Sequence, residues 1–177
     1  MKKLFTTLFI AMLTMVAYAQ FDPDPTMLTF KTFTQGNNPL VFNCDNLFMY
    51  VVDNKGKMEC DEHIRTFKDG KRFNTRLKTQ GTTNRQSQIF LSIKTLGTLT
   101  LYASSASSEA DRQIVILKGA KDIVTDVVEQ SNKRPIVVNI DKVGEYQISY
   151  PDGAINIYGI RFVPKVPEIF ENPEEKK

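Results

Sequence analysis

The stretch that decides the fold is Gly97 to Ser108, which reads GTLTLYASSASS. Apolar residues recur there at every second position, namely at Leu99, Leu101 and Ala103. This period of two is typical of a β-strand with one buried face. The Ser and Ala residues that follow have little to bury, as in a polar surface loop. The stretch therefore predicts a central strand of an all-β core, with Leu101 inward and Thr100 outward.

Similar short segments, separated by turn signals such as Asp69-Gly70, recur along the chain from Met27 to Val163. About ten short strands are predicted, and the pattern favours an antiparallel β-sandwich or jelly roll over a barrel or an α/β fold. Two segments are less regular. Glu59 to Lys68 is ambiguous and could hold one short helical turn. Leu47 to Val52 (LFMYVV) is apolar on both faces of a strand, and it is predicted to be buried on both sides or covered by a loop.

Residues 1–19 have the pattern of a secretory signal peptide. Two lysines precede an apolar run over residues 4–16, and the sequence Ala-Tyr-Ala at 17–19 matches an A-x-A cleavage site. A membrane anchor is the alternative, although the run is short for a bilayer span. We expect an exported protein, periplasmic or extracellular, with one sandwich domain over residues 20–163 and a Pro-rich charged tail over 164–177, and no membrane span after cleavage.

The charge balance argues against a nucleic-acid or anionic-membrane partner. The chain has 23 basic and 20 acidic residues, and removal of the two N-terminal lysines leaves 21 against 20, a net charge of +1. A chain whose net charge is this close to zero is not expected to bind DNA or RNA.

Cys44 and Cys60 are the only cysteines and both lie in the exported part. Because exported proteins meet oxidising conditions, we predict a disulfide that closes a loop of about 15 residues. Two reduced thiols are the alternative. Cys60 to His63 is a weak metal pattern, since structural zinc prefers four Cys or His ligands. No metal or cofactor is predicted, because calcium-loop motifs are also missing around the candidate carboxylates Asp111, Asp122 and Asp126.

Four sequence segments occur in a fixed order and carry a resemblance to known proteins. They are GTLTLYASS (97–105), Asp111-Arg112, GEYQIS (144–149) and INIYGIRFV (155–163). They resemble the small β-sandwich domains attached to secreted pectate lyases and surface proteins of Bacteroides-type bacteria, which look like galactose-binding-type carbohydrate-binding modules. The resemblance covers roughly Arg72 to Val163, and no lyase domain accompanies it. It implies a jelly-roll fold and a polysaccharide context.

Catalytic residues are not indicated. The serines of Ser104 to Ser108 lack a nucleophile-elbow context, and the single histidine, His63, has no evident triad partner. A glycosidase-like carboxylate pair is open on spacing alone, but scattered surface acids explain the Asp and Glu residues more simply. We therefore predict that the protein is not an enzyme.

Sugar binding requires an exposed aromatic face beside groups that match hydroxyls. The chain has no Trp, so tyrosines are the candidates, and the cations on one face of Arg72 to Lys78 suggest acidic sugars. The candidate ligand-binding residues are Tyr102, Arg112, Tyr150, Asp152, Asn156, Tyr158, Arg76, Lys78 and Arg85.

Structural alternatives stand beside several of these candidates. Tyr146, Tyr150 and Tyr158 also fit core positions with satisfied hydroxyls, and Arg112 fits a structural contact with loop carbonyls or a carboxylate. The basic strand fits a solvated face whose cations discourage edge pairing. The predicted function is a secreted, non-catalytic carbohydrate-binding-like module for a polysaccharide or glycan, including acidic plant or host glycans. The alternative is a surface protein-interaction or structural domain, such as an adhesin component or inhibitor, without a sugar site. Buried rings at Tyr102, Tyr150 and Tyr158 would favour this alternative.

Overall fold

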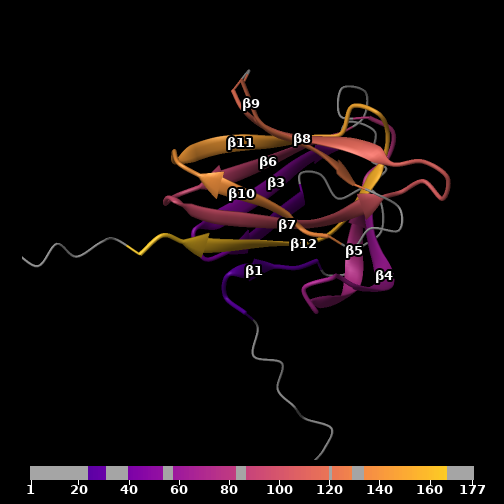
Figure 1. The fold of residues 1–177 in the computed structure, drawn as a ribbon, viewed down its shortest axis with the longest axis horizontal. Helices are drawn as coiled ribbons and strands as arrows, with labels where there is room; N and C mark the ends of the chain where they lie inside the picture. Colours follow the sequence, from indigo (N-terminus) through magenta and orange to yellow (C-terminus); the bar gives the residue numbers. More distant parts are fainter. Residues whose placement is uncertain are drawn as a thin grey trace, which may run out of the picture.

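The computed structural model describes residues 24–30, 40–53, 58–82, 87–119, 121–128 and 134–166. These residues form two six-stranded antiparallel sheets, which we call sheet A and sheet B (Figure 1). Sheet A has the order β10 (Ile136–Ile140), β7 (Gly97–Ser105), β12 (Ile155–Pro164), β5 (Arg72–Lys78) and β4 (Glu59–Thr66), with β1 (Met27–Leu28) also paired to β12. Sheet B has the order β2 (Leu40–Cys44), β3 (Leu47–Asp53), β6 (Ser87–Ile93), β11 (Gly144–Ser149), β8 (Arg112–Lys118) and β9 (Lys121–Val128).

The prediction of an all-β antiparallel sandwich is confirmed. Strand β7 pairs with β10 on one side and with β12 on the other, so it is central in sheet A. Leu99 and Leu101 lie in the main core, which also takes Met49 and Leu91 from sheet B. Alternation along β7 therefore positions the inward side chains as the sequence predicted.

The helical turn left open at Glu59 to Lys68 is not formed. This segment is strand β4, which pairs with β5 and has an irregular register between Glu62 and Arg65. Its exposed and half-buried side chains are mostly polar and charged, which hides the strand period from a hydrophobicity pattern. Pairing with β5 decides the conformation.

A second, smaller core lies on the outward side of sheet A. It consists of Phe67, Phe73, Tyr102 and Tyr158. Strand β5 pairs with β12 only at Asn156–Lys78 and Ile157–Leu77, and the β4–β5 hairpin then runs across the direction of β7 and β12 (Figure 1). We call this cluster the aromatic clasp, because its rings hold the hairpin against β7 and β12.

The rings of the aromatic clasp meet mainly edge to face. The centroids of Phe67 and Tyr102 are 5.0 Å apart at 80°, and those of Phe67 and Phe73 are 5.7 Å apart at 89°. Gly159 on β12 makes room for Phe73, because a Cβ atom there would lie 2.5 Å from a carbon of its ring. The clasp therefore depends on a residue without a side chain at this position.

The predicted disulfide between Cys44 and Cys60 is not formed, and both residues are free thiols. Cys60 is buried in β4, opposite Leu77 of β5. Cys44 ends β2, and its Sγ lies 3.7 Å from the carbonyl oxygen of Thr26. Each sulfur thus packs among other partners. Burial raises the pKa of Cys44 to about 11 and that of Cys60 to about 12, so both stay protonated near neutral pH.

We expect both thiols to react slowly with a thiol reagent in the folded protein at pH 8, because the thiolate is the reactive form. In denaturant, and without a reductant, the same protein should titrate two thiols. The measurement is an absorbance count with a disulfide reagent before and after unfolding. A count of zero in the unfolded, unreduced chain isolated from its native compartment would establish the disulfide instead.

Candidate functional site: an aromatic face on sheet B

Three aromatic rings gather on the outward side of sheet B. Phe48 and Tyr50 lie on β3, and Phe90 lies on β6 opposite Tyr50. The rings of Tyr50 and Phe90 are stacked, with centroids 4.8 Å apart and planes at 17°. The ring of Phe48 is 6.2 Å from that of Tyr50 at 42°. All three side chains are half-buried, and we call this surface the aromatic face.

Strand periodicity explains why these rings point outward. In β3 the buried positions are Leu47, Met49, Val51 and Asp53, so the residues between them face away from the core. Strand β6 behaves in the same way, because Ile89, Leu91 and Ile93 are buried while Phe90 is not. The prediction that LFMYVV is buried on both sides is therefore wrong. Its two faces are both apolar, but only one belongs to the core.

Polar groups border the aromatic face. The hydroxyl of Tyr50 donates a hydrogen bond to Oε2 of Glu145, at 2.7 Å, and Glu145 is exposed on β11. This hydrogen bond is the main reason why the pKa of Tyr50 is raised to about 12. The register also sets Gln147 of β11 opposite Phe90, and Ser92 of β6 opposite Phe48. The face thus combines a flat apolar centre with hydrogen-bonding groups at its side.

Such an arrangement can bind a sugar ring. The apolar C–H side of a pyranose stacks on aromatic carbon, and its hydroxyls donate to a carboxylate at the edge. Phe48, Tyr50 and Phe90 were not among the residues predicted from the sequence. The sequence does carry a signal for them. In two strands every second residue is aliphatic, and the positions between include aromatic residues.

The tyrosines proposed from the sequence do not form an open site. Tyr102, Tyr150 and Tyr158 are only 1%, 0% and 0% exposed. The Tyr102 hydroxyl donates to Oδ2 of Asp69 at 2.8 Å, and the Tyr158 hydroxyl lies 3.2 Å from Nδ1 of His63. The prediction of an exposed aromatic platform at these three positions is therefore wrong. The three side chains are buried, as expected for core residues.

The two candidate cations of β5 are paired with carboxylates of β4. Nε of Arg76 is 2.8 Å from Oδ1 of Asp61, and a second donor of the same guanidinium is 3.1 Å from Oδ2. Lys78 contacts Glu59 and lies 3.6 Å from Oδ2 of Asp61. The Arg76 hydrogen bond lowers the pKa of Asp61. This network neutralises the Arg76 and Lys78 part of the basic face that the sequence suggested, whereas Arg72 is exposed and lies outside the network.

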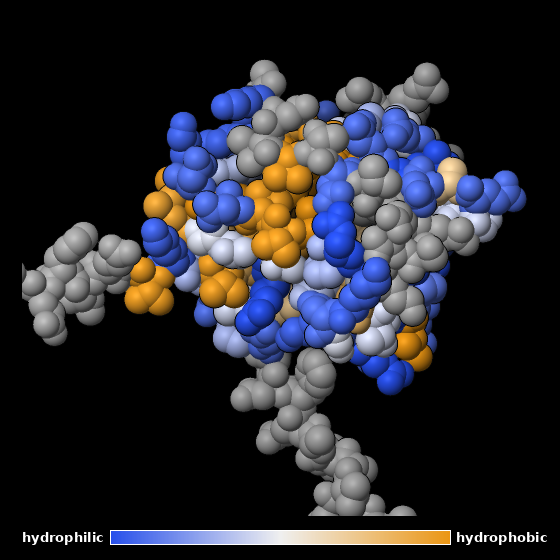
Figure 2. All heavy atoms as spheres, viewed as in Figure 1, coloured by the Kyte–Doolittle hydropathy of each residue, from blue (hydrophilic) through white to orange (hydrophobic). Residues whose placement is uncertain are grey.

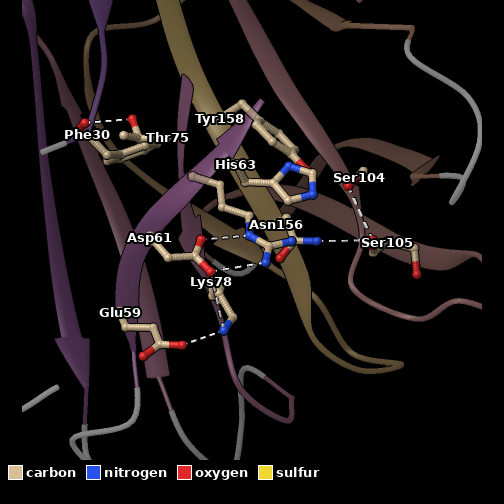
Figure 3. A network of polar contacts seen from close by, with 11 residues as sticks. Phe30, Glu59, Asp61, His63, Thr75, Lys78, Ser104, Ser105, Asn156 and Tyr158 are labelled. Atoms are coloured by element: carbon tan, nitrogen blue, oxygen red, sulfur yellow. Dashed lines mark hydrogen bonds and ion pairs between the residues drawn. The ribbon is translucent and has the colours of Figure 1, made fainter. Parts of the chain in front are cut away.

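Asn156 lies beside this network and Arg112 lies elsewhere. Asn156 is opposite Lys78 in the register, is buried, and donates from Nδ2 to the carbonyl oxygen of Ser105 at 3.2 Å (Figure 3). Arg112 donates a hydrogen bond to the carbonyl oxygen of Asp152 at 3.3 Å. This is the structural contact with a loop carbonyl that stood as the alternative to ligand binding. Arg85 falls outside the described residues.

The described residues show neither a metal site nor a membrane-spanning helix. No group of three or more His, Cys, Asp or Glu side chains in this part of the chain could hold a metal ion. The side chain of Asp122, one of the calcium candidates, falls outside it. No helix within the same ranges has the length and apolar character needed to cross a membrane.

No protein-family profile and no curated protein matches the chain. Several solved structures do, at low identity. One is the CBM51-2 and INT domains of ZmpB from Clostridium perfringens, with 9% identity, a TM-score of 0.43, and 77% of this chain covering 40% of that one. Another is the CBM22-1 xylan-binding domain of Xyn10C from Paenibacillus barcinonensis, with 10% identity, a TM-score of 0.40, and 66% of this chain covering 87% of that one. A third is CsCBM6-3 of Clostridium stercorarium in complex with cellobiose, with 11% identity, a TM-score of 0.30, and 77% of this chain covering 95% of that one.

Proposed function

We propose that the protein is a non-catalytic carbohydrate-binding-like module whose ligand lies on the aromatic face. The observation that carries this proposal is the stacked pair of Tyr50 and Phe90 beside the Glu145 carboxylate. Sugar recognition needs an aromatic surface and oriented hydrogen-bonding groups, and this face offers both. The sequence resemblance to polysaccharide-associated domains supports the same class of ligand. The signal-peptide pattern of residues 1–19 supports a location outside the cytoplasm.

The composition of the aromatic face supports binding without catalysis. Glycoside hydrolysis in most enzyme families uses a pair of carboxylic groups on either side of the scissile bond. Among the outward residues of β3, β6 and β11 that the structure describes, Glu145 is the one carboxylate. A lone carboxylate hydrogen-bonded to a tyrosine suits recognition of hydroxyls rather than bond cleavage.

A second candidate function is a protein-interaction or structural domain. The burial of Tyr102, Tyr150 and Tyr158 favours it, because the rings that would have marked a sugar site in the sequence belong to the interior. Under this alternative the aromatic face packs against another protein, since aromatic residues are enriched at protein interfaces.

We expect Tyr50→Ala and Phe90→Ala each to weaken binding to a polysaccharide about tenfold, because each removes a stacking surface worth roughly 1 kcal/mol or more. The measurement is affinity electrophoresis of the protein in gels that contain single polysaccharides. Val137→Ala is the matched control, because Val137 is an apolar side chain on β10 of sheet A and is 60% exposed. Circular dichroism of each variant establishes that the fold is kept.

Two outcomes would contradict the proposal. Retardation that survives both aromatic substitutions would move the site away from the aromatic face. Failure of a broad glycan array and of all the gels to retain the protein would favour the protein-interaction alternative.

A further inference from the structure

We infer that the aromatic face selects uncharged glycan chains, and that Glu145 is the residue that keeps anionic glycans away from it. This inference rests on the proposed function, since it concerns the choice of ligand at the same face. It opposes the preference for acidic glycans that the basic residues of β5 suggested. The carboxylate has two effects, because it accepts hydroxyl hydrogen bonds from a neutral sugar and repels a carboxylate or sulfate on an acidic one.

The carboxylate of Glu145 lies next to the stacked pair of the aromatic face. Oε2 of Glu145 accepts the Tyr50 hydroxyl at 2.7 Å, and Tyr50 is itself stacked on Phe90. A sugar ring on Tyr50 would therefore lie next to the carboxylate, within the Debye length of about 10 Å at ordinary ionic strength. The charge is held at the edge of the stacking surface rather than on a side chain that swings freely.

The outward positions within β3, β6 and β11 supply no cation that pairs with Glu145. In the described parts of β3, β6 and β11 these positions hold Phe48, Tyr50, Val52, Gln88, Phe90, Ser92, Glu145, Gln147 and Ser149. None is a cation. The candidate cations Arg76 and Lys78 lie on sheet A and are paired with Asp61 and Glu59. Lys94 follows β6 at the same parity and is exposed, but none of the ion pairs among the described residues joins it to Glu145. Glu145 is the charged side chain that contacts the stacked pair, through the hydroxyl of Tyr50.

The size of the effect follows from the distance. One negative charge about 7 Å from the carboxylate, in water, weakens binding about threefold, and a polyanion that places several charges near the face loses more. Salt screens the effect and should bring acidic and neutral chains closer together.

Affinity electrophoresis with matched polymers tests the inference. Hydroxyethylcellulose and carboxymethylcellulose share a backbone but differ in charge, and galactan and polygalacturonate form a similar pair. The unchanged protein, Glu145→Gln and the control Glu62→Gln are compared at low salt and at 0.5 M salt. Glu62 is an exposed carboxylate on β4 of sheet A, so this control removes the same charge from another surface.

We expect the unchanged protein to prefer the neutral member of the pair that it binds. Glu145→Gln should gain about threefold in affinity for the acidic member at low salt, and this gain should disappear at high salt. Glu62→Gln should leave the preference unchanged. An ultraviolet titration gives an independent readout: Glu145→Gln should lower the pKa of Tyr50 from about 12 toward the usual tyrosine value, because the charged acceptor is lost.

Each contrary result has a distinct meaning. An acidic polymer that binds as well as its neutral counterpart at low salt overturns the role of Glu145 and leaves the proposed function standing. The same holds if Glu145→Gln changes neither the preference nor the titration of Tyr50. If none of the four polymers retards the protein and a broad glycan array does not retain it either, the proposed function itself fails, and the selectivity fails with it.

Discussion

Leu101→Ala is expected to lower the free energy of unfolding by about 2–5 kcal/mol, the usual loss when a large buried aliphatic side chain is truncated. Leu101 is fully buried in the main core, on the central strand β7. Its neighbours come from both β10 and β12 in the register, opposite Ile136 and Ile160. Such a site is held from both sides and cannot collapse readily around a cavity, which favours a large effect.

Thr100→Ala is the matched control on the same strand. Thr100 points to the opposite side of sheet A and is half-buried, so its truncation should cost much less. Urea unfolding followed by circular dichroism measures both variants on one scale. Equal midpoints for the two variants would mean that β7 presents the other face to the core.

Gly159→Ala is expected to destabilise the protein by about 1–3 kcal/mol through overpacking beneath the aromatic clasp. The added Cβ atom would lie 2.5 Å from one ring carbon of Phe73 and 3.2 Å from the carbonyl oxygen of Leu28. The Phe73 ring is buried among Phe67, Tyr102 and Tyr158, so it cannot move without disturbing them.

A double-mutant cycle with Phe73→Ala separates the ring clash from a general intolerance of alanine in β12. Once the ring of Phe73 is gone, Gly159→Ala should cost clearly less than it does in the unchanged protein. Thermal or urea unfolding of the four proteins gives the coupling energy. Strictly additive losses would show that Gly159 is needed for a reason other than space for Phe73.

The sheet-forming segments were predictable where hydrophobic residues alternate. Strands such as β7 and β11 show this in the sequence, because inward side chains such as Leu101 and Ile148 recur with a period of two. Strand β4 could not be found in this way. Its exposed and half-buried positions are mostly polar, and what makes it a strand is backbone pairing with β5, which a hydrophobicity pattern does not report.

The same error concealed the carboxylates that pair with the cations of β5. With Glu59 and Asp61 left in a possible helical turn, the cations of β5 had no partners, and an acidic ligand followed. The aromatic face was hidden for another reason. Phe48 and Tyr50 look like core residues because aromatic side chains are apolar, and only the register with Phe90 assigns them to one outward surface.

The aromatic clasp also bears on the valency of the protein. Because the β4–β5 hairpin covers part of the outward side of β7 and β12, the aromatic rings there serve the interior, whereas the stacked pair of the aromatic face lies on sheet B. Under the proposed function, the residues that the structure describes then offer one such face to one glycan segment. Tight retention on a polysaccharide would come from avidity, through several linked copies on the same polymer, rather than from a second site within one copy.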